Sequence, residues 1–256
     1  MSEFRQISLS SEGRVATVTL RNPPVNVMTG RMMEEIGSAL EQIEREARAS
    51  LVVFRGEGKC FSAGADIKEH MPEQAADMIR SLHRLVESVV GTRTPLMAAL
   101  HGAALGGAFE FASLADIVLV EEGCHLGLPE IQLASFPPVA AAFYPAMIGW
   151  KNALQVLLTG DRIAPQRAVD LGLATAVLPK EGFDSRVGDW INRLTSLSLP
   201  ALKLCKLATL SGFIQRPFDA LTTTESLFVQ ELMKTHDAQE GIEAFLQKRA
   251  PVWEHR

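Results

Sequence analysis

A glutamate follows two glycines in the stretch AALGGAFEFASLAD, Ala103 to Asp116, which is otherwise apolar. Burying a carboxylate costs free energy unless the group is paired or has a chemical role. If a helix begins near Gly107, the Gly107 amide is one of its unpaired N-terminal donors, and Glu110 lies one turn further along the same face. The stretch predicts an amide and a carboxylate that point at one small volume. The alternative is a glutamate whose carboxylate simply reaches solvent or an arginine.

Two opposing influences act on the pKa of Glu110. The helix dipole favours the ionised acid, whereas burial among the apolar neighbours favours the neutral acid. Such a balance can hold a pKa where general acid–base chemistry works. A second glutamate, Glu130 in GLPEIQLASFPP, could supply a partner. Two acids beside an activated carbonyl are what the addition of water, its removal, or the transfer of a proton requires.

The stretch GKCFSAGADIKEH, Gly58 to His70, contains a second turn of small residues, from Ser62 to Ala65. Small side chains let a ligand approach the backbone, whose amides can point at an oxygen. The alternative is a tight turn that needs glycine for its conformation only. Together, the two glycine turns could form an oxyanion hole with two donors, each contributing about 3 kcal/mol in a transition state.

The composition excludes several other classes of protein. The chain has 256 residues, 47% of them hydrophobic, and a net charge of −5 without a basic stripe, so nucleic-acid binding is not expected. Neither a signal peptide nor an apolar run of membrane-spanning length is evident, and three widely spaced cysteines suit a reducing compartment. We therefore expect a soluble, cytoplasmic protein. The histidines lack metal-ligand spacing, and no dinucleotide or P-loop motif occurs.

Hydrophobic periodicity predicts an α/β fold. Strands are expected at 14–20, 51–56, 95–100 and 116–120, and helices over about 29–43 and 78–89, with Thr29 as an N-cap. Beyond Gly149 the pattern becomes mostly helical, and two helices should end at glycine C-caps, in KNALQVLLTG and PQRAVDLG. We divide the chain into a core, 1–195, and a helical C-terminal region, 196–256, which covers the core or a neighbouring subunit.

Four segments occur in an order and spacing that resemble the enoyl-CoA hydratase/isomerase, or crotonase, superfamily. They are FSAGADIKE, HGAALGGAFEFASLADIVL, GLPEIQL and LLTGDRIAPQRAVDLGLATAVL, and the resemblance covers essentially the whole chain. It implies a spiral of ββα repeats, a helical C-terminal region, and homotrimers that commonly pair into hexamers. It also implies an acyl-CoA thioester as substrate, so that coenzyme A is part of the substrate and no separate cofactor is needed.

The resemblance also implies roles for individual residues. Ala65 and Gly107 match the two residues whose backbone amides hold the thioester oxygen, and Glu110 and Glu130 match the acid–base glutamates of the hydratases. The positions that correspond to CoA-binding residues of the family are Pro24, Val25, Ala63 and Lys68. Lys248, Arg249 and Trp253 could meet the CoA phosphates or adenine from an adjacent subunit, or could form only a solvated charged terminus.

The segment FPPVAAAFYP, Phe136 to Pro145, departs from the family pattern, which has a glycine-rich helix start here. Pro138 stands where the family usually has a glycine whose amide helps to hold the water, and proline has no amide hydrogen. The water is therefore held differently, or the substrate and the site of attack differ. Pro138 and Tyr144 are candidates for the acyl pocket. Tyr144, the only tyrosine, could instead be packed with its hydroxyl at the surface.

Three functions remain open from the sequence. The first is a hydratase for a 2-enoyl-CoA or for a cyclic dienoyl-CoA such as cyclohexa-1,5-diene-1-carbonyl-CoA, with the cyclic substrate as the specific prediction because of Pro138. The second is an enoyl-CoA isomerase, which the presence of both glutamates disfavours. The third is a non-catalytic relative that binds acyl-CoA or RNA, which the acid pair and the net acidity disfavour.

Overall fold

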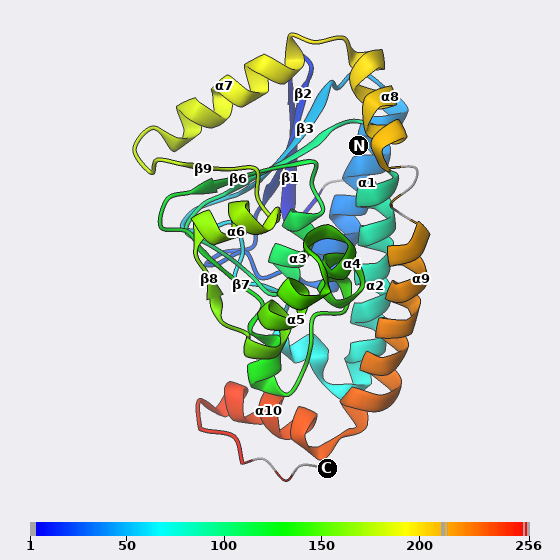
Figure 1. Cartoon of the computed structure of the whole chain (residues 1–256), viewed down its shortest axis with the longest axis vertical. Helices are drawn as coiled ribbons and strands as arrows, with labels where there is room; N and C mark the ends of the chain where they lie inside the picture. Colours follow the sequence, from blue (N-terminus) through cyan, green and yellow to red (C-terminus); the bar gives the residue numbers. More distant parts are fainter. Residues whose placement is uncertain (1–3, 211–212, 214, 253, 255–256) are drawn as a thin grey trace.

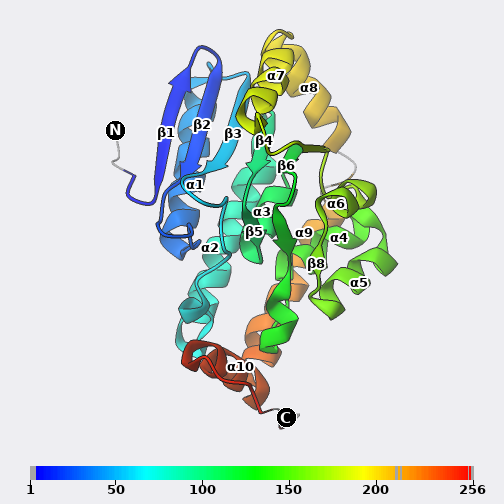
Figure 2. The same ribbon diagram turned by 90° about the vertical axis from the view of Figure 1, so that its left-hand side faces the viewer.

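The computed structural model describes residues 4–210, 213, 215–252 and 254. Its main sheet contains six strands in the order β1–β2–β3–β4–β6–β9 (Figures 1 and 2). They are β1 (Ile7–Glu12), β2 (Val15–Leu20), β3 (Leu51–Gly56), β4 (Leu96–Leu100), β6 (Ile117–Glu121) and β9 (Ala176–Leu178). β1 pairs with β2 antiparallel, and the remaining neighbours are parallel. The mixed α/β fold agrees with the expectation from the sequence.

Both faces of the main sheet are buried, as is usual for parallel strands. Along β3, Val52 and Phe54 join a large core cluster on one face, whereas Leu51 and Val53 join a smaller cluster on the other. Helix α7 (Phe183–Thr195) covers the smaller cluster. Helices α1 (Gly30–Glu46) and α2 (Pro72–Gly91) contribute buried side chains to the larger one. The apolar runs in the sequence are therefore interior strands.

A small second sheet positions the segments that carry Glu110 and Glu130. It consists of β5 (Ala103–Leu105), β7 (His125–Gly127) and β8 (Arg162–Ile163), which sequence periodicity does not reveal. β5 and β7 are parallel, with Leu105 opposite Gly127. β5 leads into helix α3 (Gly107–Ser113), and β7 leads into the 3₁₀ turn η2 (Pro129–Leu133). The segments that carry the two candidate acids thus begin side by side.

The second half of the chain is mostly helical. It contains α4 (Pro138–Ile148), α5 (Trp150–Thr159), α6 (Pro165–Leu171), α7, α8 (Leu199–Leu210), α9 (Gln215–Ser226) and α10 (His236–Gln247). α5 and α6 end at Gly160 and Gly172 in the left-handed conformation, which confirms both predicted caps. The helical pattern expected beyond Gly149 is interrupted after α9. A π-helical turn, η3 (Leu227–Glu231), and a 3₁₀ turn, η4 (Leu232–Lys234), follow α9.

The C-terminal region packs on the same chain. Helix α9 lies against α4 and beside α2, where Nδ1 of His83 is 2.8 Å from a carboxylate oxygen of Glu225 (Figure 1). Helix α10 contacts η2 and the 3₁₀ turn η1 (Ile67–His70). The region therefore reaches both loops that carry candidate site residues. In the described part of the chain, none of the helices has the length and apolar character needed to cross a membrane.

Candidate active site

Glu110 is buried in the first turn of helix α3, with 2% of its surface exposed. The backbone amide of Ala140, in the first turn of α4, donates a hydrogen bond of 2.7 Å to Glu110 Oε1. The carboxylate therefore lies between the N-terminal ends of two helices and reaches neither bulk solvent nor an arginine. This arrangement contradicts the alternative, left open by the sequence, that the Glu110 carboxylate simply reaches solvent or an arginine.

Glu130 approaches the same helix from η2. Its Oε1 lies where Gly106 would carry a side chain, because a β-carbon built on Gly106 would be 2.6 Å from that oxygen. Gly106 also has a φ of +50°, which favours glycine. Glu130 Oε2 is buried and has no hydrogen-bond partner among the described residues. The free oxygen of Glu130 is available to a water or a substrate.

The amides of Ala65 and Gly107 lie close together. A β-carbon built on Gly107 would be 3.4 Å from the β-carbon of Ala65, 4.0 Å from its amide nitrogen and 3.8 Å from Glu110 Oε2. The turn at Ala65 is fixed because Met28 donates to the carbonyl of Gly64, while the amide of Asp66 donates to the carbonyl of Met28. Within the described residues, the amides of Ala65 and Gly107 have no acceptor. They form a pair of free donors beside a carboxylate.

Burial raises the pKa of both glutamates, and the charge of Glu130 raises the pKa of Glu110 further. The amides of Ala140 and Val139 act in the opposite direction on Glu110. Since each negative charge opposes the ionisation of the other acid, the two groups titrate as a pair. Over the pH interval between the two deprotonations, the pair holds one proton and provides one acid and one base.

Pro138 is the first residue of α4, where a missing amide hydrogen costs no helical hydrogen bond. Its carbonyl accepts a hydrogen bond of 3.0 Å from the hydroxyl of Thr224 in α9. The donors that reach Glu110 come instead from the next two residues. The helix start thus supplies amides to the acid pair although the family glycine is replaced.

A cavity of about 20 Å³ separates the two carboxylates from an apolar wall, and such a volume holds about one water molecule. Its lining includes Ala65, Gly107, Glu110, Glu130, Pro138, Met33, His70, Met78, Ile79, Leu82, Phe136, Pro137 and Phe228. The structure therefore brings together five of the residues predicted from the sequence: both acids, both amide donors and Pro138.

Tyr144 lies behind the acid pair and is not among the residues that line this cavity. Tyr144 is fully buried, and its hydroxyl donates a hydrogen bond to Ser113 Oγ over 3.1 Å. The Ser113 hydroxyl in turn donates to the backbone carbonyl of Glu110. The alternative that places the hydroxyl at the surface is therefore wrong. A role for Tyr144 in an acyl pocket stays a prediction.

The predicted CoA-binding residues lie on two neighbouring loops. The amide of Ala63 donates to the carbonyl of Val25 over 2.9 Å, which joins the loops but leaves this amide unavailable to a ligand. Pro24 and Lys68 are exposed. The side-chain amide of the buried Asn26 donates to the carbonyl of Glu57 and thereby anchors the first loop. This residue was not singled out from the sequence. The loops form a surface next to Ala65, and their role in CoA binding stays a prediction.

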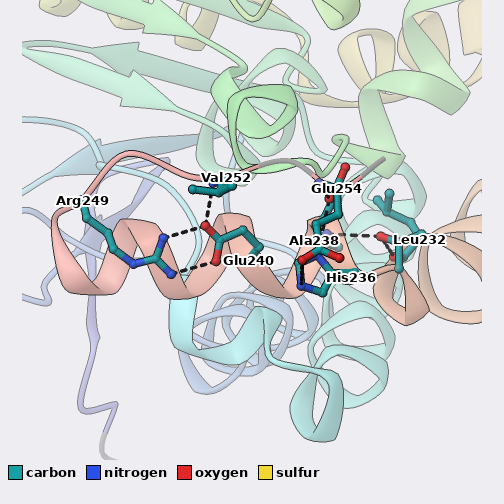
Figure 3. Close-up of polar contacts among 9 residues, drawn as sticks. Leu232, His236, Ala238, Glu240, Arg249, Val252 and Glu254 are labelled. Atoms are coloured by element: carbon teal, nitrogen blue, oxygen red, sulfur yellow. Dashed lines mark hydrogen bonds and ion pairs between the residues drawn. The ribbon is translucent and has the colours of Figure 1, made fainter. Parts of the chain in front are cut away.

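The C-terminal basic residues lie elsewhere. The guanidinium of Arg249 makes two hydrogen bonds, of 2.5 and 2.7 Å, to the carboxylate of Glu240 in α10 (Figure 3). The amide of Val252 donates to the same carboxylate. Lys248 is exposed at the end of α10, and Trp253 is outside the described residues. Arg249 and Val252 therefore both bind the carboxylate of Glu240 in α10 of the same chain.

His70 and Phe228 line the cavity but were not singled out as site residues from the sequence. His70 is buried, and its Nδ1 lies 2.9 Å from the carbonyl oxygen of Asp66, yet the sequence raised it only as a metal ligand to be rejected. Burial lowers the pKa of His70 and favours the neutral imidazole. Phe228 reaches the cavity from the π-helical turn. No sequence signal marks it, because a single π turn within a helical stretch is not evident from the spacing of apolar residues.

Two buried carboxylates beside two free backbone amides define a site that can stabilise an enolate and move protons. Comparison with known proteins agrees with this class of site. The sequence model of the enoyl-CoA hydratase/isomerase family matches residues 10–256. The chain belongs to that family.

Individual relatives extend over nearly the whole chain. A cyclohexa-1,5-dienecarbonyl-CoA hydratase from Thauera aromatica is 32% identical over 251 residues, which cover 98% of this chain and 97% of the relative. A probable enoyl-CoA hydratase from Bacillus subtilis (strain 168) is 33% identical over 250 residues, with 96% and 97% covered. A crystal structure of an enoyl-CoA hydratase from Mycobacterium avium subsp. paratuberculosis K-10 has a TM-score of 0.89 at 28% identity, with 98% and 99% covered. The crotonase fold predicted from the sequence is thus confirmed.

Proposed function

We propose that the protein is an acyl-CoA hydratase that adds water to, or removes it from, an α,β-unsaturated thioester. One observation carries the proposal: the buried carboxylates of Glu110 and Glu130 lie beside the free amides of Ala65 and Gly107. Family membership supports it. Isomerases of the family often keep only one of the two acids, so the presence of both favours hydration.

In the proposed reaction, the thioester oxygen accepts hydrogen bonds from the amides of Ala65 and Gly107. Negative charge then develops on that oxygen as the enolate forms, and each donor contributes about 3 kcal/mol. The unprotonated acid of the pair takes a proton from the water while the water oxygen bonds to the electrophilic alkene carbon and the alkene electrons pass into the enolate. The protonated acid then delivers a proton to the α-carbon, which restores the thioester carbonyl. The free Oε2 of Glu130 and the volume of the cavity suit one bound water.

For the acyl group, our specific proposal is a cyclic dienoyl-CoA, with a linear 2-enoyl-CoA as the second candidate. The Thauera aromatica relative, named for a cyclic diene thioester, supports the first candidate, as does the replacement of the family glycine by Pro138. The Bacillus subtilis relative supports the second at nearly the same identity.

The test is a direct assay of the purified protein on crotonyl-CoA and cyclohexa-1,5-diene-1-carbonyl-CoA side by side, with products identified by mass and NMR. Water addition to the cyclic diene alone supports the specific proposal. Fast hydration of crotonyl-CoA selects the linear candidate. Absence of turnover with both substrates, together with binding of their saturated analogues, would support a non-catalytic relative.

We further propose a homotrimer or a dimer of trimers in the cytoplasm, with no cofactor beyond the CoA of the substrate. Helix α5 supports self-association because its exposed side chains Trp150, Leu154 and Leu158 follow one another at intervals of four residues along one face. Light scattering of the purified protein tests the oligomer. A chelator that leaves activity unchanged supports the absence of a metal cofactor.

A further inference from the structure

The cavity at the acid pair is too small for an acyl group. Its volume of about 20 Å³ holds about one water molecule, whereas every enoyl or dienoyl thioester brings several carbon atoms to the same place. Side chains that line the cavity must therefore move when the acyl group enters. The side chain that moves also determines how large an acyl group the site accepts.

Phe228 lines the cavity together with the two acids. Phe228 is 1% exposed. The centroid of its ring lies 5.5 Å from that of Phe136, in an edge-to-face arrangement, and 6.2 Å from that of the His70 imidazole. These geometries are typical of well-packed aromatic contacts. Among the cavity-lining residues, Phe228 is the one contributed by the C-terminal region. It closes the cavity from outside the α/β core.

The backbone that carries Phe228 is irregular, unlike the backbones of most other lining residues. Met33, Met78 and Glu110 lie on regular helices, and Phe136 precedes two prolines whose φ angles are fixed. Phe228 lies instead in the π-helical turn η3, between α9 and the 3₁₀ turn η4. Single π turns occur frequently at functional sites.

Both ends of this irregular segment are anchored. On the α9 side, the hydroxyl of Thr224 donates to the carbonyl of Pro138, which starts the helix that holds Glu110. On the α10 side, the backbone at Gly241 packs directly against Leu133 at the end of η2. The turn with Phe228 therefore spans two fixed points, and a local change in the turn moves the ring without detaching the C-terminal region.

On these grounds we propose that Phe228 is the specificity-determining residue that sets the size of the acyl group. When its ring turns out from between His70 and Phe136, the space that it leaves receives the part of the acyl group beyond the reacting carbons. The proposal rests on the proposed function, since it assumes that an acyl-CoA ester occupies the cavity.

Binding of saturated acyl-CoA esters tests the proposal without depending on turnover. The affinities of acetyl-CoA, butanoyl-CoA, cyclohexanecarbonyl-CoA and free CoA are measured by titration calorimetry on the full chain. Phe228→Ala should raise the ratio of cyclohexanecarbonyl-CoA to acetyl-CoA affinity about tenfold, and Phe228→Trp should lower it, while the affinity of free CoA stays the same. Should Phe228→Ala fail to fold, Phe228→Leu should change the ratio in the same direction by a smaller factor.

Leu227→Ala is the matched control, because Leu227 lies in the same turn with half of its surface exposed and is not among the cavity-lining residues. This variant should leave the ratio unchanged. If Phe228→Ala and Phe228→Trp bind free CoA normally but keep the wild-type ratio, the proposal is wrong and the proposed function stands. If wild-type protein binds no acyl-CoA ester, the proposed function itself is wrong.

Discussion

Helix α10 packs so closely on the turn with Glu130 that Gly241 has no room for a side chain, because a β-carbon there would overlap the carbonyl oxygen of Leu133. Gly241 has ordinary helical backbone angles, so only this contact requires glycine. The C-terminal helix therefore touches the backbone that presents one acid of the site.

Gly241→Ala is expected to lower both stability and turnover. In a helix, alanine is more favourable than glycine by about 1 kcal/mol, so helix propensity alone would stabilise the variant. A loss of stability would therefore be due to the contact with Leu133. Gly188→Ala in α7 is the control, since a β-carbon on Gly188 meets nothing within 4 Å and should be neutral or stabilising. Thermal unfolding and activity of both variants provide the measurement. Equal stability of the two variants would contradict the contact.

Replacement of either acid should abolish most of the activity. Glu110→Gln and Glu130→Gln should each lower turnover by orders of magnitude, with about 10²–10⁴-fold expected for a general acid or base, and leave the binding of acyl-CoA esters largely intact. The shape of the side chain is kept, so the fold is preserved. Steady-state kinetics beside Glu122→Gln, an exposed acid, provides the comparison. A variant that stays near the wild-type rate would remove that glutamate from the mechanism.

The acid pair should also make stability depend on pH. In the unfolded chain these glutamates lose their protons near the ordinary pKa of 4.5, whereas the folded pair holds protons to higher pH. The folded state therefore binds more protons above that value, and the free energy of unfolding falls as pH rises. Glu110→Gln should gain stability relative to wild type between about pH 5 and about pH 9. Urea unfolding across this range tests it, and a difference that is constant with pH would be the contrary result.

Gly106 should tolerate no side chain. Alanine there would strain a backbone with φ of +50° and would also meet Oε1 of Glu130 at 2.6 Å. Gly123→Ala separates the two effects, since Gly123 also has positive φ, +84°, but an open surrounding. We expect both variants to lose about 1 kcal/mol from backbone strain and only Gly106→Ala to lose most of its turnover. Comparable activity in the two variants would exclude displacement of Glu130.

Pro138→Gly should shift preference toward linear enoyl-CoA. Glycine restores the amide that the family usually has at this helix start, and it removes the pyrrolidine ring from the cavity lining. The relevant quantity is the ratio of kcat/KM for crotonyl-CoA to that for the cyclic diene thioester. Pro165→Gly, at the first turn of α6, controls for the loss of a helix-starting proline. An unchanged substrate ratio would remove Pro138 from the specificity argument.

Parts of this fold could be predicted from the sequence because their signals are local. Thr29 caps α1, and Met33, Ile36 and Leu40 lie on its buried face, as their helical spacing predicts. The strands β5, β7 and β8 could not be predicted, because two or three residues are too few to show an alternating pattern. Their pairing partners are also remote in the sequence.

In the candidate site, too, the features with local sequence signals could be predicted and those that depend on remote contacts could not. Spacing alone placed the amide of Gly107 one turn before Glu110, which the structure confirms. Glu130 and the turn at Ala65 were raised as candidates from the sequence, and resemblance matched them to family roles, but their proximity to Glu110 depends on tertiary pairing that no local pattern contains. Arg249 pairs with Glu240 in the same chain, and its contact with CoA from an adjacent subunit stays a prediction.

The parallel pairing of Leu105 with Gly127 has a consequence for how this architecture can change its chemistry. The two acid positions are set by main-chain hydrogen bonds between β5 and β7, not by any bond between the acids themselves. Either carboxylate can therefore be exchanged in evolution without dislodging its neighbour. A scaffold of this kind lets new reactions arise by single replacements at either position, while the free main-chain amides of Ala65 and Gly107 stay in place.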